Sequence, residues 1–290
     1  MTRRRATGFG FSAVLLWSLL ALFTVGSAPV PPFLLSALSF AIAGAIGLLW
    51  LFATGGLRQI TQVPLYVYAF GTLGLFGYHA LYFSALRLAP AAEAGLIAYL
   101  WPLFIVLFSG FLPGERLGVG HVIGAFVAFA GAAVIVGAEV RSFEADAALG
   151  YGLALLCALT WSTYSVGSRR FGAVPTGSVA VFCVASALLS LIAHITFETT
   201  VWPVNTLGWL AVLGLGLGPV GLAFFVWDIG VKRGDIQLLG VASYAAPVLS
   251  TMVLVLVGVA SAQWTLVAAA LLITAGAPLA ANASAKTSTG

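Results

Sequence analysis

Three polar ring side chains lie close together in an otherwise apolar stretch of the sequence. Tyr78 and Tyr82 are four residues apart, and His79 and Tyr82 are three apart. On a helix, all three side chains therefore share one face. Hydroxyls and an imidazole on such a face can hydrogen-bond to the polar groups of an organic ligand, while the rings contact its apolar part. This pattern favours a binding site for an amphipathic small molecule, with plain core packing as the alternative.

Two prolines in the middle of apolar segments point to the same region. Proline cannot donate a backbone hydrogen bond to the carbonyl four residues earlier. Pro102 therefore frees the carbonyl of Ala98, and Pro247 frees that of Ser243. In a membrane, freed carbonyls are tolerated where they face protein or a wet cavity. A kink satisfied by neighbouring side chains is the alternative to a binding role.

Further aromatic residues at mid-span complete the candidate site. Tyrosine and tryptophan near helix ends are explained by anchoring at the membrane interface, an alternative that stays open for Tyr82, but rings at mid-span are not. An imidazole changes charge near physiological pH, so His79 is also the candidate for proton coupling. The predicted substrate-binding residues are Trp17, Tyr78, His79, Tyr82, Tyr99, Trp101, Trp161, Trp227, Ser243 and Tyr244.

The composition indicates the environment in which the chain folds. Hydrophobic residues make up 61% of the 290 residues, charged ones only 7%, and the mean hydropathy is +1.11. Soluble domains are about one quarter charged, so a water-soluble enzyme and a disordered protein are excluded. With 12 basic and 8 acidic residues, the chain lacks the basic face of a nucleic-acid module. Cys157 and Cys183 are too few for a disulfide framework or a zinc site.

Apolar runs of about 20 residues predict the membrane spans. Because no linker is long enough for a soluble domain, residues 1–290 are expected to form one all-α membrane domain, with a disordered tail at 282–290. We predict ten transmembrane helices, near 8–27, 32–53, 63–87, 91–112, 119–138, 149–168, 177–197, 206–231, 236–258 and 262–281.

The basic residues predict the orientation, since cytoplasmic loops are enriched in lysine and arginine. With ten spans and both termini in the cytoplasm, the outer segments hold only Arg87 and Arg141. The cytoplasmic segments hold Arg3, Arg4, Arg5, Arg58, Arg116, Arg169, Arg170, Lys232, Arg233 and Lys286. Ten against two predicts a multi-pass protein of the inner membrane with both termini inside.

The two halves of the sequence match each other weakly. A shift of 145 places Gly71, Gly95, Tyr99, Pro102 and Gly131 on Gly216, Gly240, Tyr244, Pro247 and Gly276. Repeat one then covers about 8–138 and repeat two about 149–281. Because each repeat holds five helices, an odd number, the second must be inverted relative to the first. Inverted repeats are typical of secondary transporters.

These features together resemble the EamA family of the drug/metabolite transporter superfamily. Shared motifs are the Trp-Ser pairs at Trp17 and Trp161, the mid-helix prolines, and Gly114-Glu115. The matching place in the second repeat has Val259-Ala260 instead, which favours a local loop-capping role for Glu115. The stretches 77–83 and 99–102 look most like family members that export aromatic amino acids from bacteria.

The resemblance implies a bacterial inner-membrane exporter of small organic metabolites, with amino acids, above all aromatic ones, as substrates and alternating access around a central cavity as mechanism. Export of drugs, sugars or nucleosides is the alternative within the superfamily. A passive channel or a membrane enzyme is the alternative outside it, but a continuous polar stripe, an HExxH helix and a nucleotide-binding loop are missing. We expect no metal or cofactor; the partners are the substrate and the bilayer, and the oligomeric state is left open.

Ionisable residues within spans suggest two ion pairs. Arg87 and Glu93 flank a short loop and are predicted to pair across it. Asp228 lies four residues before Lys232, the spacing of an intrahelical pair.

Overall fold

The computed structural model describes residues 1–137, 140 and 143–288, with side chains to residue 284. Every regular element in this part of the chain is helical, which confirms the all-α class. The elements are α1 (Arg3–Trp17), α2 (Leu20–Gly26), α3 (Pro32–Ala53), α4 (Leu57–Ile60), α5 (Leu65–Leu88), α6 (Ala91–Ala98), α7 (Trp101–Ser109), α8 (Val119–Val136), η2 (Ala145–Ala147), α9 (Ala148–Arg170), α10 (Ser178–Phe197), α11 (Thr206–Leu217), η3 (Gly218–Leu222), α12 (Ala223–Arg233), α13 (Ile236–Ala242), α14 (Ala245–Leu256) and α15 (Trp264–Ser288).

Nine helical segments of the described chain are long and apolar enough to cross a membrane. Helix α5 is not among them, although it has 24 residues, because it carries four tyrosines and a histidine. The nine segments are Arg3–Gly26, Pro32–Ala53, Ala91–Ser109, Val119–Val136, Ala145–Arg170, Ser178–Phe197, Thr206–Arg233, Ile236–Leu256 and Trp264–Ser284.

Several of these segments are interrupted near their middle. Helix α6 gives way to α7 three residues before Pro102, and α13 gives way to α14 in the same way before Pro247. Each proline then lies in the first turn of the following helix, where its missing N–H is not needed. Helices α1 and α2 meet just after Trp17, and a π-helical turn, η3, joins α11 to α12. The positions of the prolines therefore predicted two of the breaks.

The helices pack in long pairs drawn from the two halves of the chain. Helix α3 lies along α10, α8 along α15, α5 along α9, and α1 along α12. Small residues let the backbones approach closely. A Cβ on Gly124 would lie 2.7 Å from the carbonyl oxygen of Gly276, and one on Gly276 would lie 2.6 Å from that of Gly124. Only glycine fits at this crossing of α8 and α15.

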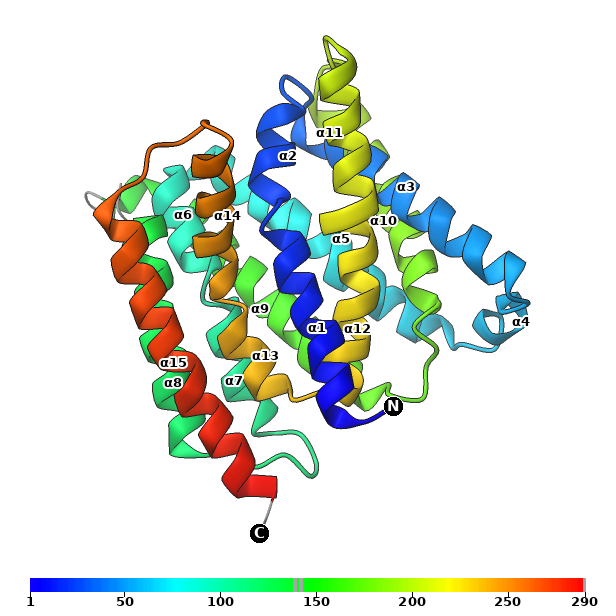
Figure 1. The fold of residues 1–290 in the computed structure, drawn as a ribbon. Helices are drawn as coiled ribbons and strands as arrows, with labels where there is room; N and C mark the ends of the chain where they lie inside the picture. The colour runs from blue at the N-terminus through cyan, green and yellow to red at the C-terminus, as the bar shows by residue number, and fades with distance from the viewer. Residues whose placement is uncertain (138–139, 141–142, 289–290) are drawn as a thin grey trace.

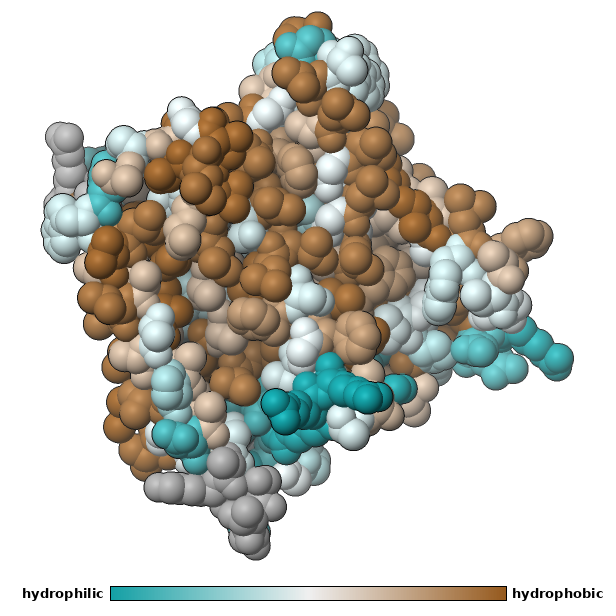
Figure 2. Space-filling view, viewed as in Figure 1, coloured by the Kyte–Doolittle hydropathy of each residue, from teal (hydrophilic) through white to brown (hydrophobic). Residues whose placement is uncertain are grey.

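Both chain termini lie at the same end of the bundle, the lower end in Figure 1, which we call the terminal end. Figure 2 shows a broad band of apolar surface across the molecule, with hydrophilic side chains gathered mainly towards that end. Many large apolar side chains are exposed in the described chain, for example Leu49, Phe52 and Leu191. Such a surface suits contact with lipid.

The C-terminal residues differ from the sequence expectation. A disordered tail was predicted from residue 282, but α15 continues to Ser288, and residues 289–290 lie outside the described part. Alanine is the strongest helix former, and residues 281, 283 and 285 are alanines. Their helix propensity accounts for the extension.

Candidate binding site

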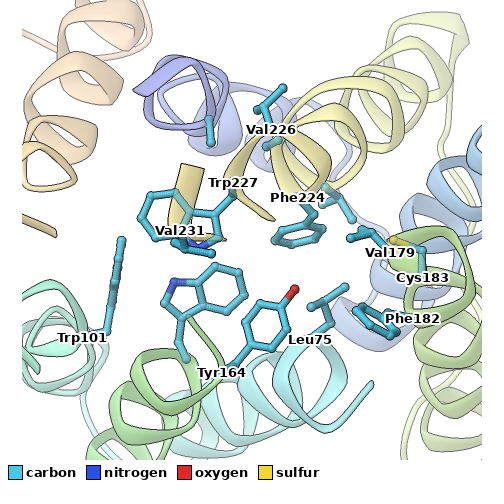
Figure 3. Packing of buried hydrophobic residues seen from close by; sticks show 14 of the residues in the cluster. Leu75, Trp101, Tyr164, Val179, Phe182, Cys183, Phe224, Val226, Trp227 and Val231 are labelled. Carbon is cyan, nitrogen blue, oxygen red and sulfur yellow. The ribbon is translucent and has the colours of Figure 1, made fainter. Parts of the chain in front are cut away.

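Four tryptophans from four helices meet at the centre of the bundle and form an indole cluster. Trp17 of α1 lies 6.0, 5.9 and 5.1 Å, centroid to centroid, from the rings of Trp101 (α7), Trp161 (α9) and Trp227 (α12). The other three rings lie 6.0–6.4 Å from one another. Figure 3 shows Trp101 and Trp227 in this packing, with Phe224 and Tyr164 beside them. Trp17 and Trp161 were predicted to bind substrate, and in the structure their rings are in contact with each other.

Hydrogen bonds fix the orientation of the cluster. The indole N–H of Trp17 donates to the carbonyl of Pro219 in the π-helical turn at 3.1 Å. That of Trp227 donates to Oγ of Ser165 at 3.1 Å. The hydroxyl of Ser162 lies 2.6 Å from the carbonyl oxygen of Ala158 and 2.9 Å from that of Trp101, so its one hydrogen is shared between α9 and the first residue of α7. Sequence reasoning missed the roles of both serines, although the repeated Trp-Ser motif was a signal for Ser162.

Rings of α5 lie directly against the indole cluster. Tyr78 stacks on Tyr82, with centroids 6.2 Å apart, and its ring lies 5.4 Å from that of Trp161. His79 lies edge-on to Phe40 of α3 at 5.1 Å and to Phe224 of α12 at 6.3 Å. Tyr78, His79 and Tyr82, which we call the α5 ring face, are only half-buried, so ligand atoms can reach them.

Tyr99 stands at the break between α6 and α7 and is also half-buried. The hydroxyl of Tyr82 lies 4.0 Å from where a Cβ on Gly95 of α6 would stand. The rings of α5 thus reach towards the helix that ends at Tyr99. The structure therefore places Tyr99, with the α5 ring face, at the α5–α6 side of the indole cluster.

Ser243 and Tyr244 do not join these rings. The Tyr244 hydroxyl accepts a 3.0 Å hydrogen bond from the backbone N–H of Leu103, and its ring contacts Phe129 of α8 at 5.9 Å. Ser243 is fully buried and donates to the carbonyl of Leu239 at 2.7 Å. Both residues were predicted to line the binding site, but in the structure their contacts are with other groups. The break before Pro102 leaves Leu103 without a helical acceptor, and Tyr244 supplies one.

The predicted pair between Arg87 and Glu93 is wrong. Arg87 instead bonds to Glu198 at 3.1 Å. The Glu198 carboxylate also accepts from the backbone N–H groups of Phe33 and Leu34, at 3.0 and 3.2 Å. These N–H groups begin α3 and have no partner within their own helix. They hold the Glu198 carboxylate by hydrogen bonds, and its negative charge attracts the guanidinium of Arg87.

The predicted pair on α12 is confirmed. Lys232 Nζ lies 2.9 Å from Asp228 Oδ1, and Thr176 donates to the other carboxylate oxygen at 2.7 Å. The ammonium of Lys232 also donates to the carbonyl of Val174 at 3.0 Å. These bonds fasten α12 to the segment that precedes α10. Both oxygens of the Asp228 carboxylate, which follows Trp227 in the sequence, therefore have partners.

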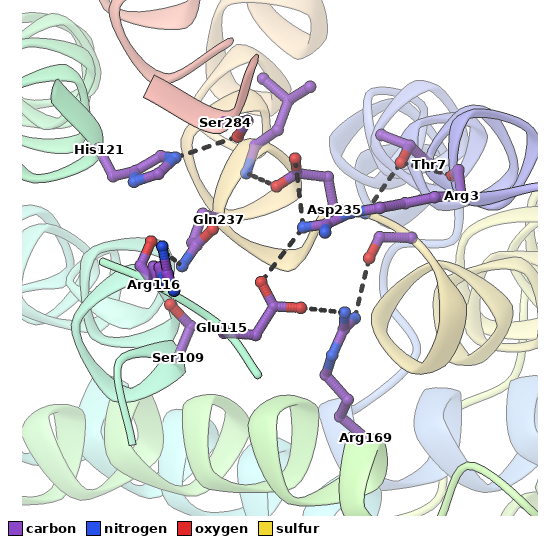
Figure 4. A network of polar contacts seen from close by, with 12 residues as sticks. Arg3, Thr7, Ser109, Glu115, Arg116, His121, Arg169, Asp235, Gln237 and Ser284 are labelled. Atoms are coloured by element: carbon purple, nitrogen blue, oxygen red, sulfur yellow. Dashed lines mark hydrogen bonds and ion pairs between the residues drawn. The ribbon is translucent and has the colours of Figure 1, made fainter. Parts of the chain in front are cut away.

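A larger polar network closes the terminal end of the bundle. Glu115 forms ion pairs with Arg3, at 3.2 Å, and with Arg169. Arg3 also lies 3.5 Å from Asp235, and Arg169 donates to the carbonyl of Gly234 at 2.9 Å. Figure 4 shows how these side chains converge from separate helices and loops. The predicted local loop-capping role of Glu115 is therefore wrong, because its partners come from distant parts of the chain.

Comparisons with known proteins agree with the resemblance noted from the motifs. The model of the EamA-like transporter family matches residues 5–137 and again residues 148–281. The aromatic amino acid exporter YddG of Ancylobacter novellus is 56% identical over 282 residues, covering 97% of this chain and 98% of its own. The protein of the same name from Salmonella typhimurium is 27% identical, covering 87% and 88%. A solved structure that is 56% identical superposes with a TM-score of 0.92, over 96% of this chain and 98% of its own.

The role of Tyr244 can be tested by removing its hydroxyl. Tyr244→Phe leaves the buried N–H of Leu103 without an acceptor, which should lower the free energy of unfolding by about 1–3 kcal/mol. The measurement is thermal melting of the purified protein in detergent. Tyr66→Phe is the matched control, since that side chain is exposed. Equal melting temperatures for the two variants would contradict the role.

Proposed function

Because the chain belongs to the EamA-like transporter family, we propose that it exports amino acids, preferentially aromatic ones, across a bacterial inner membrane. The observation that carries this proposal is a half-buried face of aromatic rings beside the indole cluster. A curated relative that is 56% identical over nearly the whole chain carries the name of aromatic amino acid exporter. Sequence similarity and ring chemistry thus lead to one substrate class.

The site suits the two parts of such a substrate. An aromatic ring can stack on tyrosine or tryptophan for about 0.5–1.5 kcal/mol per contact beyond area burial. The side chains that form the α5 ring face and the indole cluster carry no formal charge apart from what His79 can acquire. The ammonium and carboxylate of the substrate would therefore be bound by hydroxyl, indole and imidazole groups.

The proposed architecture is ten spans in two inverted repeats, with α5 as the tenth span. The double match of the family model, to 5–137 and 148–281, supports two copies of one unit. Exchanging the two copies maps the pair of α5 and α9 onto that of α12 and α1, and maps α3 with α10 and α8 with α15 onto themselves. Packing with this exchange symmetry is what two inverted repeats would produce.

The charges support placing the terminal end in the cytoplasm. Ten lysines and arginines fall in the segments predicted to be cytoplasmic and two in the segments predicted to be outside, as the positive-inside rule requires of cytoplasmic loops. The polar network around Glu115 then closes the cytoplasmic side. Both termini would lie inside the cell.

Alternating access is the mechanism that fits this closure. The ion pairs of Glu115 with Arg169 and of Arg3 with Asp235 each join a residue of the first half to one of the second. The indole cluster likewise takes two rings from each half. Export would require these contacts to part so that substrate enters from the cytoplasm, and to re-form before release outside.

The substrate class is tested by removing rings from the site. Tyr99→Ala and Trp101→Ala should lower affinity for phenylalanine roughly two- to tenfold, because each removes one stacking partner. The assay is saturation of phenylalanine counterflow in proteoliposomes at equal protein content. Matched controls are Tyr66→Ala and Trp264→Ala, whose rings are exposed on the surface. Equal losses in all four variants would contradict a ring-lined site, and counterflow of sugars or nucleosides alone would contradict the substrate class.

Orientation is tested with single cysteines, after replacement of the buried Cys157 and Cys183. Thr200→Cys and Gln59→Cys place a thiol at exposed positions near opposite ends of the bundle. In intact cells, an impermeant thiol reagent should label the cysteine at position 200 and spare the one at 59. Labelling in the opposite order would reverse the proposed orientation.

Closure of the cytoplasmic side is tested by neutralising its central carboxylate. Glu115→Gln removes the charge that attracts Arg3 and Arg169, so the cytoplasmic end should open more often. A cysteine replacing the fully buried Ser109 should then react several-fold faster with a thiol reagent added to inside-out vesicles. Glu144→Gln, an exposed acid near the other end, is the control. An unchanged labelling rate in Glu115→Gln would show that the network does not hold the gate.

A further inference from the structure

The site must bind a zwitterion without a charged side chain. The charge nearest in sequence to the indole cluster is Asp228, beside Trp227, and it is held by Lys232 and Thr176. Isolated charges are costly to bury, so the ammonium and the carboxylate of an amino acid each need neutral partners of the right polarity. An ammonium has only donors and therefore requires an acceptor.

The imidazole of His79 is such an acceptor in a defined orientation. Its Nδ1 lies 2.7 Å from the carbonyl oxygen of Leu75, one turn earlier on α5. A carbonyl oxygen only accepts, so Nδ1 must carry the hydrogen. In a neutral ring, Nε2 then bears the lone pair. Within the described chain, Nε2 has no hydrogen-bond partner, and His79 is only half-buried.

The other polar side chains of the site either can only donate or can both donate and accept. An indole N–H can only donate, and those of Trp17 and Trp227 already donate to Pro219 and Ser165. The tyrosine hydroxyls can donate as well as accept. Nε2 of His79 is thus the one ring atom of the site that can accept but not donate.

The rings packed around His79 restrict the orientation of its imidazole and so the direction of the Nε2 lone pair. Phe40 and Tyr78 lie edge-on to the imidazole at 5.1 and 5.2 Å, and Phe83 and Phe224 at 6.1 and 6.3 Å. Packing on several sides restricts rotation of the imidazole.

We propose that Nε2 of His79 accepts a hydrogen bond from the α-ammonium group of the substrate, while tyrosine hydroxyls donate to its carboxylate. The proposal rests on the proposed function, since it assumes an amino acid substrate. It makes His79 a specificity-determining residue that selects a free amine. Compounds with the same ring and carboxylate but no ammonium would bind without using His79.

The experiment compares two ligands that differ only in the ammonium group, L-phenylalanine and 3-phenylpropanoate. Affinity is the concentration that half-saturates the change in tryptophan fluorescence of the purified protein. His79→Phe keeps a planar ring among Phe40 and Phe83 but removes the acceptor. It should weaken phenylalanine binding about tenfold or more, since a charged hydrogen bond is lost, and change 3-phenylpropanoate binding less than threefold. His79→Gln, whose amide oxygen can accept, should restore phenylalanine binding to within about threefold of wild type.

The outcomes separate this inference from the proposed function. If wild-type protein carries phenylalanine in counterflow but His79→Phe weakens both ligands equally, or neither, the assignment is overturned and the transport function stands. Unchanged melting of each variant shows that an equal loss is not unfolding. If wild-type protein neither binds nor carries any aromatic amino acid, the proposed function fails and this inference with it.

Discussion

Backbone groups freed by broken helices have no water to bind in a bilayer and must find partners within the protein. Here three such partners come from the other half of the chain. Trp17 donates to the carbonyl of Pro219 in the π-helical turn, and Ser162 donates to that of Trp101 at the start of α7. Tyr244 accepts from Leu103 just after Pro102. The breaks that shape the centre of the molecule also hold its two halves together.

Around these bonds, apolar and polar contacts are distributed differently along the bundle. The middle is held by ring contacts, which are weak individually and can part without leaving a bare charge. The ends are fastened by ion pairs in which the carboxylate is buried, Glu198 with the exposed Arg87 at one end and Glu115 with the half-buried Arg169 at the other. Parting such a pair leaves a buried carboxylate without its partner unless water enters. Opening one end is therefore coupled to hydrating it, which suits a protein that admits water to one side at a time.

The indole cluster and the α5 ring face have different places in this arrangement. The four indoles pack on one another, and Trp101, Trp161 and Trp227 are buried. Tyr78, His79 and Tyr82 lie beside the indole cluster and remain half-buried. The residues predicted together as one site therefore include both a buried cluster and a partly exposed ring face.

Sequence alone determined the features that depend on local spacing and on the solvent. Composition indicated a membrane, apolar runs predicted long helices, nine of which in the described chain are long and apolar enough to cross a membrane, Pro102 and Pro247 marked two breaks, and four-residue spacing paired Asp228 with Lys232. Only the tertiary structure decided which distant groups meet: Arg87 with Glu198 instead of Glu93, Glu115 with Arg169, and Tyr244 with Leu103. Helix periodicity dictates neighbours within about one turn, whereas partners between helices depend on how whole surfaces pack. The N–H groups at the start of α3 and the N–H of Leu103 after Pro102 have no partner in their own helices. The side chains that bind them, Glu198 and Tyr244, could be identified only from the tertiary structure.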